Sequence, residues 1–178
     1  YPSFNPNNRA EYSHAASRNR IVTDQVEPGS IMKLARLSAA LLSGEFALDD
    51  QLDTTPGSMM IDGHQIKDVS NHGMISVRDV LIKSSNIGAT KIAFKLGQRA
   101  MLDMLTRLGF GQPTGIMFPG EAKGFLPYGY PELKKIELSN LSYGYHMSAT
   151  PLQIIRAFSD IANSGILYPV TLIKQTKP

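Results

Sequence analysis

The sequence predicts an α+β protein that is predominantly helical. Several stretches repeat apolar residues at helical spacing, whereas only residues 166–173 have the β-branched, apolar composition of a strand. With 178 residues, 42% of them hydrophobic, the chain is long and apolar enough to build a core. We expect a single incomplete domain spanning residues 1–178, with a lead-in at 1–29, a helical core at 30–164 and the strand at its end.

The lead-in contains prolines and asparagines without a helical repeat, so it is expected to be extended or looped. Residues 30–42 are good helix formers and apolar on almost every side, which predicts a helix inside the core. Gly44 ends it, because glycine readily adopts the left-handed conformation of helix ends. Residues 49–75 are rich in turn formers and predict a loop with at most a small hairpin.

Further helices follow. Ser76 is a suitable N-cap for a short helix over 77–82. After a polar turn the helical spacing continues over 87–96, Gly97 closes that segment, and the spacing returns over 101–108.

The segment 113–131 is again rich in glycine and proline. Thr150, with Pro151 at the first helical position, begins a last helix that Gly165 ends.

Composition excludes several functional classes. A net charge of +3 with scattered lysines and arginines gives no reason to expect a nucleic-acid partner. The longest apolar stretch, 37–42, is far below the ~20 residues that cross a bilayer, and we expect no signal peptide. The absence of cysteine removes disulfides and thiol nucleophiles. His64 and His72 flank Asp68 without a clean ligand spacing, so we expect neither a metal nor another cofactor.

Ser30 and Lys33 are candidates for nucleophilic chemistry. Residues three apart share one face of a helix, and the first turn disfavours a protonated amine because its free N–H groups carry positive partial charge. A partly desolvated lysine there would be neutral enough to take a proton from the serine. The alternative is an N-cap serine followed by a surface lysine, which is the commoner meaning of an isolated S-x-x-K.

A second polar group follows about fifty residues later, where Ser84 and Asn86 can point the same way from alternate positions. Taken alone, the segment predicts a turn. Together with S-x-x-K it is similar to the S-x-x-K, S-x-N, K-T-G set of serine acyl transferases.

A longer series of motifs continues this pattern in a fixed order. The series consists of Arg18-Asn19-Arg20, Thr23-Asp24, Glu27-Pro28-Gly29-Ser30 with Lys33, Gly63-His64, Ile66, Lys67-Asp68, Ile82-Lys83-Ser84-Ser85-Asn86, Ser142-Tyr143-Gly144-Tyr145 and Thr150-Pro151-Leu152-Gln153. With them, the whole chain resembles the class B penicillin-binding proteins, the peptidoglycan transpeptidases, and the septal (cell-division) type more than the elongation-specific type.

The sequence departs from this family at several points. Ile31 and Leu34 replace a small hydroxyl residue and a proline, and His146 replaces the glycine that completes Tyr-Gly-Tyr-Gly. No K-T-G follows, because Lys174-Gln175-Thr176 lacks the glycine and comes too early. We therefore expect a fragment that ends before the strand carrying the third motif.

The resemblance implies the helical part of a penicillin-binding/β-lactamase-like fold, whose complete form packs a helical subdomain against a five-stranded antiparallel sheet. It implies acyl transfer through a serine ester, with a D-Ala-D-Ala stem peptide as donor and an amine as acceptor. β-Lactams would acylate the same serine. By resemblance, Ser30 is the nucleophile, Lys33 its base, Ser84 a proton carrier and Asn86 an orienting residue.

The resemblance also suggests substrate contacts by Ser85, Val69 and Tyr145, divisome proteins as partners, and a position at the periplasmic face of the bacterial inner membrane in the full-length parent. A truncated chain would be inactive or strongly impaired. Two other classes stay open: a β-lactamase or β-lactam sensor, and a non-catalytic folding core or interaction fragment.

Overall fold

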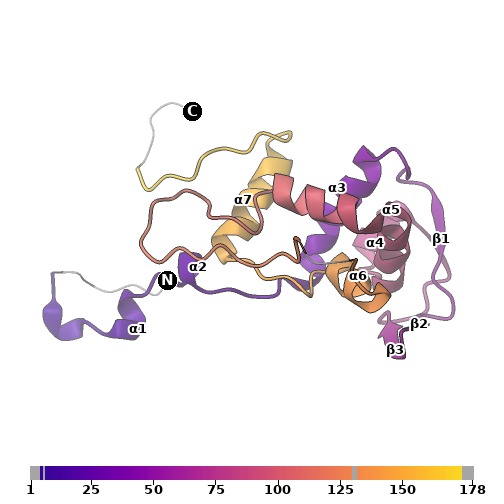
Figure 1. The fold of residues 1–178 in the computed structure, drawn as a ribbon, viewed down its shortest axis with the longest axis horizontal. Helices are drawn as coiled ribbons and strands as arrows, with labels where there is room; N and C mark the ends of the chain where they lie inside the picture. Colours follow the sequence, from indigo (N-terminus) through magenta and orange to yellow (C-terminus); the bar gives the residue numbers. More distant parts are fainter. Residues whose placement is uncertain (1–4, 6, 130–131, 174–178) are drawn as a thin grey trace. The chain divides into compact units, whose positions relative to one another are not determined.

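The structure is a computed structural model that describes residues 5, 7–129 and 132–173 (Figure 1). Its contacts divide the chain into two compact units. One unit contains the described residues of Tyr1–Val26, Leu108–Phe125 and Ser148–Pro178, and the other contains those of Glu27–Arg107 and Leu126–Met147. The α+β class with mainly helical content is confirmed.

The Glu27–Met147 unit is built on the helices α3 (Lys33–Leu42), α4 (Val77–Ile82), α5 (Asn86–Arg107) and α6 (Lys135–Ser142). Helix α5 packs against both α3 and α6 (Figure 1). A short 3₁₀ helix, η2 (Gly29–Met32), leads directly into α3, so the predicted helix over 30–42 is present with a tighter first turn. Gly97 interrupts α5 with φ 78° and ψ 166°, which confirms the predicted break.

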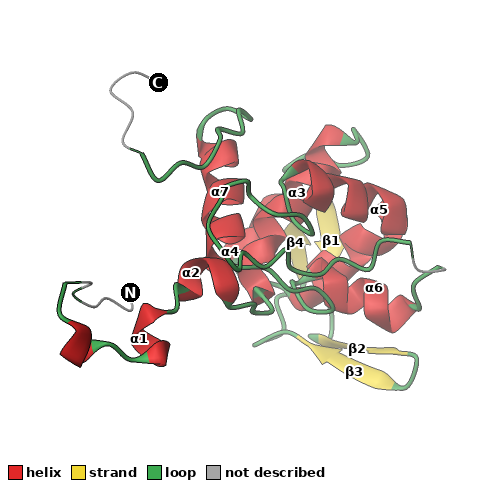
Figure 2. Cartoon of the chain, turned by 60° about the vertical axis from the view of Figure 1, so that its left-hand side comes forward, coloured by secondary structure: helices red, strands yellow, loops and turns green. Residues whose placement is uncertain are grey.

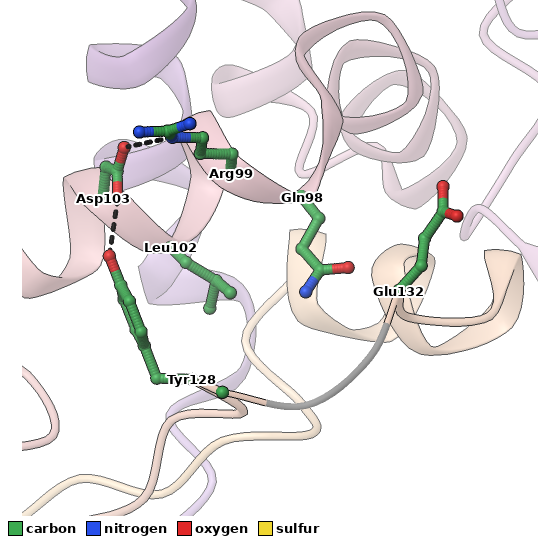
Figure 3. A pocket seen from close by; sticks show the side chains of 7 residues that line it. Gln98, Arg99, Leu102, Asp103, Tyr128 and Glu132 are labelled. Atoms are coloured by element: carbon green, nitrogen blue, oxygen red, sulfur yellow. Dashed lines mark hydrogen bonds and ion pairs between the residues drawn. The ribbon is translucent and has the colours of Figure 1, made fainter.

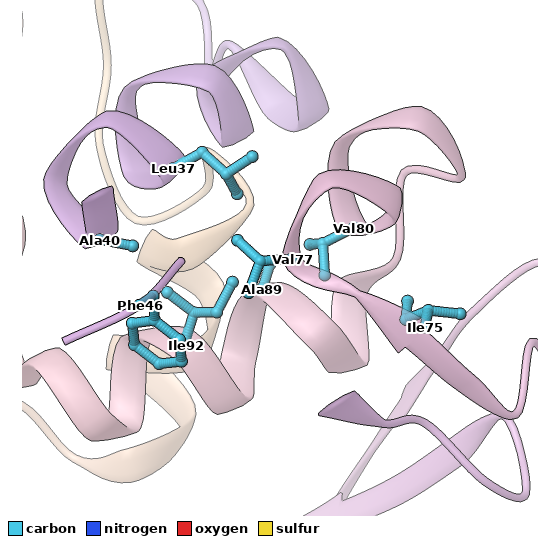
Figure 4. Packing of buried hydrophobic residues seen from close by; sticks show 8 residues of the cluster. All are labelled: Leu37, Ala40, Phe46, Ile75, Val77, Val80, Ala89 and Ile92. Carbon is cyan, nitrogen blue, oxygen red and sulfur yellow. The ribbon is translucent and has the colours of Figure 1, made fainter. Parts of the chain in front are cut away.

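The core of this unit lies between α3, α4, α5 and the strand β4 (Met74–Ser76) (Figure 4). Its buried side chains are Leu37, Ala40, Phe46, Ile75, Val77, Val80, Ala89 and Ile92. Full burial of one large aliphatic side chain stabilises a fold by roughly 1.5–3 kcal/mol. The cluster therefore fixes α3 firmly against the α4–α5 segment.

Two antiparallel strand pairs complete the unit (Figure 2). The small hairpin that the sequence predicts is formed by β2 (Ser58–Ile61) and β3 (His64–Lys67). The other pair, β1 (Gln51–Asp53) with β4, was not predicted. Each of its strands has 3 residues and the whole hairpin lies between them, so no local turn signal reveals the pairing.

Helix α6 also escaped prediction, because much of its buried surface is polar. Ser139 and Ser142 are fully buried, and the Ser139 hydroxyl lies 2.8 Å from the hydroxyl of Thr90 on α5. At its start, Glu137 accepts a hydrogen bond from the Lys134 N–H at 2.8 Å. A search for apolar periodicity does not detect a helix that is buried through hydroxyl groups.

The other unit contains the short helices η1 (Arg9–Glu11), α1 (His14–Ser17) and α2 (Arg20–Thr23), where the sequence predicted only a looping lead-in, and the longer helix α7 (Pro151–Ala162). Helix α2 packs against α7. Thr150 caps α7 and Pro151 occupies its first turn, as predicted. The buried Gln153 amide donates to the backbone carbonyls of Gln112 and Lys123 at 2.8 and 2.9 Å.

The predicted strand at 166–173 is not formed, and these residues are irregular. A strand needs a neighbour to pair its backbone groups, and among the described residues none lies alongside this segment. Ile166, Tyr168 and Leu172 are accordingly exposed. Lys174-Gln175-Thr176 lies outside the described residues. In the described ranges, no helix has the length and apolar character needed to cross a membrane.

Candidate active site

The Lys33 amine lies at the centre of a cluster that contains the four predicted catalytic side chains. Lys33 is 0% exposed. Its Nζ lies 3.2 Å from Ser30 Oγ, 3.0 Å from Ser84 Oγ, 2.8 Å from Asn86 Oδ1 and 2.5 Å from the Ser84 carbonyl oxygen. Ser30 and Lys33 come from the η2–α3 junction, and Ser84 and Asn86 from the turn between α4 and α5. Two distant segments thus meet at one amine.

The 3₁₀ geometry of η2 aligns Ser30 with Lys33. In a 3₁₀ helix, residues three apart eclipse one another, whereas in an α-helix they are offset around the axis. Ser30 lies in the 3₁₀ segment Gly29–Met32 and Lys33 begins α3, and the serine Oγ lies 3.2 Å from the lysine Nζ. The sequence spacing S-x-x-K therefore acquires its close contact from this tighter turn.

Burial lowers the pKa of Lys33 from 10.5 to about 8, and the negative charge of Asp68 limits that fall. Desolvation disfavours the charged form of an amine, while a nearby carboxylate favours it. The neutral amine is therefore accessible close to physiological pH.

Ser84 has a left-handed backbone, with φ 54°. This conformation is uncommon for a residue other than glycine and costs on the order of 1–3 kcal/mol. It lets one residue direct both its carbonyl and its hydroxyl oxygen to Lys33. Hydrogen bonds from the Ser84 and Ser85 N–H groups to the Leu81 and Val80 carbonyls, at 3.1 and 3.0 Å, hold the turn.

In the sequence, Asp68 stands out only as part of a motif and as a candidate metal ligand. In the structure it organises the Ser84–Asn86 turn. Its Oδ1 accepts hydrogen bonds from the N–H groups of Asn86 and Ile87 at 2.5 and 3.1 Å, and its Oδ2 accepts one from Ser85 Oγ at 2.6 Å. Asp68 is thus the cap of α5 from 18 residues away in sequence. Capping signals in a sequence are local, which explains why this one was missed.

Ser85 lies differently from the expectation that it contacts substrate. It is 0% exposed, and its Oγ accepts a hydrogen bond from the Gly88 N–H at 2.9 Å while donating to Asp68. Its hydroxyl is therefore engaged in holding the turn. Val69 and Tyr145, the other two predicted substrate contacts, are 99% and 47% exposed.

The segment Tyr143–His146 lies against the residues that precede Ser30. The Gly29 N–H donates to the Gly144 carbonyl at 3.0 Å, and Glu27 accepts a hydrogen bond from the His146 N–H at 3.1 Å. The Tyr143 and Tyr145 rings meet edge to face, 5.8 Å apart. His146 has φ 59°, so it occupies a left-handed conformation in which the glycine of the Tyr-Gly-Tyr-Gly motif would be unstrained.

Replacing Gly144 by alanine is expected to displace Gly29 and, with it, the neighbouring Ser30. Gly144 has φ +87°, and an added Cβ would overlap the Gly29 carbonyl oxygen. Relieving such overpacking typically costs about 1–3 kcal/mol, and a displaced nucleophile can lose on the order of 10²-fold in rate. Thermal unfolding and acylation kinetics measure the two effects.

The matched control for this change is Gly63→Ala. Gly63 has φ +81° but nothing within 4 Å of an added Cβ, so it shares the backbone strain without the overlap. Equal losses in both variants would show that the contact between Gly144 and Gly29 has no special importance.

Arg36 is a further buried residue that the sequence analysis did not single out. Its guanidinium donates to the Leu141 carbonyl near the end of α6 and, at 3.5 Å, to the Met32 carbonyl. Burial lowers the pKa of Arg36, although an arginine keeps its charge. The negative end of the α6 dipole partly compensates that charge, so Arg36 ties α3 to the helix that leads into Tyr143.

A separate hollow of about 420 Å³ lies in the same unit, beside the part of α5 after Gly97 (Figure 3). Its side chains include Gln98, Leu102 and Asp103, and the Tyr128 hydroxyl donates to Asp103 at 2.6 Å. No member of the Lys33 cluster lines it. Within the described ranges, no three histidine or acidic side chains are grouped so as to hold a metal ion.

Comparison with known proteins gives consistent matches. The family model "Penicillin binding protein transpeptidase domain" matches residues 1–178. The chain is 42% identical over 174 residues to the probable peptidoglycan D,D-transpeptidase PbpC of Pseudomonas aeruginosa, covering 98% of this chain and 31% of that protein. It is 37% identical over 180 residues to the peptidoglycan D,D-transpeptidase FtsI of Escherichia coli, covering 99% of this chain and 30% of that protein.

Among solved structures, the apo TP domain of penicillin-binding protein 3 from Burkholderia pseudomallei superimposes with a TM-score of 0.85 and 41% sequence identity. The match covers 90% of this chain and 48% of that one. The chain therefore spans less than a third of the length of these two curated relatives and about half of this solved domain.

Proposed function

Because the chain belongs to the penicillin-binding protein transpeptidase family, we propose that it is part of a peptidoglycan D,D-transpeptidase acylated on Ser30. The observation that carries this proposal is the buried Lys33 amine within hydrogen-bond reach of Ser30, Ser84 and Asn86. The donor is a stem peptide ending in D-Ala-D-Ala, and the acceptor is an amine of a neighbouring stem. β-Lactams acylate the same serine.

Hydrogen-bond counting supports Lys33 as the base. A neutral amine has two N–H donors and one lone pair. The Ser84 carbonyl and Asn86 Oδ1 only accept hydrogen bonds, and they lie 2.5 and 2.8 Å from Nζ. With both N–H groups directed at them, the lone pair is left for a hydroxyl proton, and Ser30 Oγ lies 3.2 Å away.

The proposed reaction proceeds in two transfers. As Ser30 Oγ attacks the carbonyl carbon of the penultimate D-Ala, its proton passes to Lys33 Nζ. Collapse of the tetrahedral intermediate breaks the peptide bond, and the Ser84 hydroxyl relays the proton from Nζ to the leaving D-Ala nitrogen. The acceptor amine then attacks the ester, returning the serine hydroxyl by the reverse proton path.

Asn86 is proposed to fix the direction of Lys33. Its Oδ1 faces Nζ, and its Nδ2 donates to the Lys67 carbonyl at 3.0 Å, so the amide has one favourable orientation. The proposal gives the backbone N–H of Ser30 the role of an oxyanion donor, a type of contact typically worth about 2.7–4 kcal/mol. The exposed Val69 and Tyr145 are proposed to contact the donor peptide.

The finer proposal is septal synthesis, with divisome proteins as partners, at the periplasmic face of the inner membrane. It is supported by the motif series, which resembles the cell-division type, and by the relative named FtsI. The β-lactamase and sensor alternatives are not favoured, since the relatives reported above are transpeptidases.

The proposal is tested by treating the complete gene product with a fluorescent penicillin and identifying the modified peptide by mass spectrometry. A stable adduct on the peptide containing Ser30 is expected. Rapid hydrolysis of the adduct would instead favour a β-lactamase, and the absence of any adduct would favour a non-catalytic role.

Acylation is expected to depend on pH through Lys33. The reaction needs the neutral amine, and the pKa of Lys33 is about 8. Below that pH the amine is protonated, so the acylation rate should fall with the neutral fraction, and above it the rate should level off. Stopped-flow acylation between pH 5 and 10, corrected for β-lactam hydrolysis in buffer, measures the profile. A rate independent of pH across this range would contradict the assigned base.

A further inference from the structure

Asp68 contacts the turn that supplies Ser84 and Asn86 to the proposed catalytic cluster, and its charge acts on Lys33. Its carboxylate accepts three hydrogen bonds, from the N–H groups of Asn86 and Ile87 and from the Ser85 hydroxyl, at 2.5, 3.1 and 2.6 Å. These donors are consecutive residues at the start of α5. Any movement of the carboxylate therefore moves the residues that hold the Lys33 amine.

We infer that Asp68 is a positioning residue that clamps the Ser84–Asn86 turn against Lys33 and supplies the counter-charge of the Lys33 ammonium. The inference rests on the proposed function and deepens it. The hydrogen bonds of Asp68 go to Ser85, Asn86 and Ile87, so its effect on Lys33 passes through the turn and through charge.

Asp68 differs in sign from several charged residues on the neighbouring elements. Arg36 on α3, Lys67 at the end of β3 and Lys83 at the end of α4 are all cations, and the Arg36 guanidinium is bonded to the Leu141 carbonyl. The negative charge of Asp68 raises the pKa of Lys33 against the effect of burial. Removing the charge of Asp68 should therefore make Lys33 lose its proton at lower pH.

Asp79 offers a matched control. Like Asp68, it caps a helix with its carboxylate, accepting a hydrogen bond from the Ser76 N–H at 3.4 Å at the start of α4. It is not among the groups that act on the pKa of Lys33. Asp79→Asn thus reproduces the loss of a capping carboxylate without changing the charge near the amine.

The experiment compares the complete gene product with its Asp68→Asn, Asp68→Glu and Asp79→Asn variants, measuring fluorescent-penicillin acylation against pH. In Asp68→Asn the amide oxygen can still accept hydrogen bonds from the Asn86 and Ile87 N–H groups, but the negative charge is lost. The pH at which the acylation rate rises should therefore be lower than in the wild type. In Asp68→Glu the charge is kept, so the pH at which the acylation rate rises should stay near that of the wild type. The added methylene displaces the Ser84–Asn86 turn, so the maximal rate should fall, by up to about 10²-fold. Asp79→Asn should change neither.

A wild-type profile in Asp68→Asn, or an equal shift in Asp79→Asn, would overturn the inference. Thermal unfolding shows whether each variant is folded. If one of the two Asp68 variants does not fold, the pH profile of the other one tests the inference.

If the wild type takes no label, the proposed function fails on its own. The inference is still tested by NMR titration of the Lys33 ε-carbon resonance, assigned with Lys33→Met. Its midpoint must move to lower pH in Asp68→Asn, and an unmoved midpoint would refute the inference independently of catalysis.

Discussion

Replacing Ser30 by alanine is expected to abolish covalent labelling of the complete gene product by a fluorescent penicillin. In the proposed reaction the serine oxygen forms the ester bond itself, so its removal leaves no other group to acylate at this position. Ser30 Oγ is the hydroxyl of the Lys33 cluster that belongs to the same helical turn as the amine, with 3.2 Å between the two atoms. Labelling is followed by gel fluorescence and by intact-mass measurement.

Ser38→Ala is the matched control, because it makes the same change on the next turns of α3. The Ser38 hydroxyl donates to the Leu34 carbonyl at 3.0 Å, within the helix. This variant should label like the wild type. Persistent labelling of Ser30→Ala at the wild-type rate would show that another residue is the nucleophile.

Replacing Lys33 by methionine is expected to lower the acylation rate by roughly 10²–10⁴-fold, the usual contribution of general acid–base catalysis. Methionine has a similar length but no amine, so the serine hydroxyl loses its proton acceptor. The rate that remains should no longer follow the titration of an amine with a pKa of about 8. Stopped-flow acylation across pH measures both effects.

Stability must be measured alongside, since the Ser84 carbonyl and Asn86 Oδ1 lose their shared donor in this variant. Because Ser84 is exposed and Asn86 is only half-buried, water can reach these acceptors, and the loss of stability should stay below the about 1–3 kcal/mol of a fully buried unsatisfied acceptor. Lys91→Met provides the control, because the Lys91 amine also donates to a backbone carbonyl, that of Asp53, away from the cluster. If Lys33→Met acylated as fast as Lys91→Met, the proposed base would be ruled out.

The sequence alone predicted most of what depends on local pattern. The helices around Lys33 and Ile92 and the cap at Thr150 follow from apolar spacing and turn chemistry, and they are present in the structure. The four residues around the amine were predicted through motif order, and they lie together.

The sequence did not predict the features that depend on a contact between residues far apart in the chain. Asp68 caps a helix from 18 residues away, and Ser139 is buried against Thr90 across 49 residues. The prediction of strands was wrong for the same reason. β1 and β4 pair across the intervening hairpin, whereas residues 166–173 have a strand-like composition but pair with none of the described residues. Amino-acid composition indicates the propensity of a segment to form a strand, but the strand forms only if a partner segment, often distant in sequence, lies beside it.

The separation of Lys33 from Ser84 along the chain affects when the proposed site can form during folding. The contact joins residues 51 positions apart, so the chain must close a long loop before the amine meets the turn. Helices such as α3 and α5 form from neighbouring residues, whereas contacts of high sequence separation form slowly. A partly folded chain can therefore possess its helices before the Lys33 amine meets Ser84, and the proposed acylation by penicillin would require that the two segments have docked.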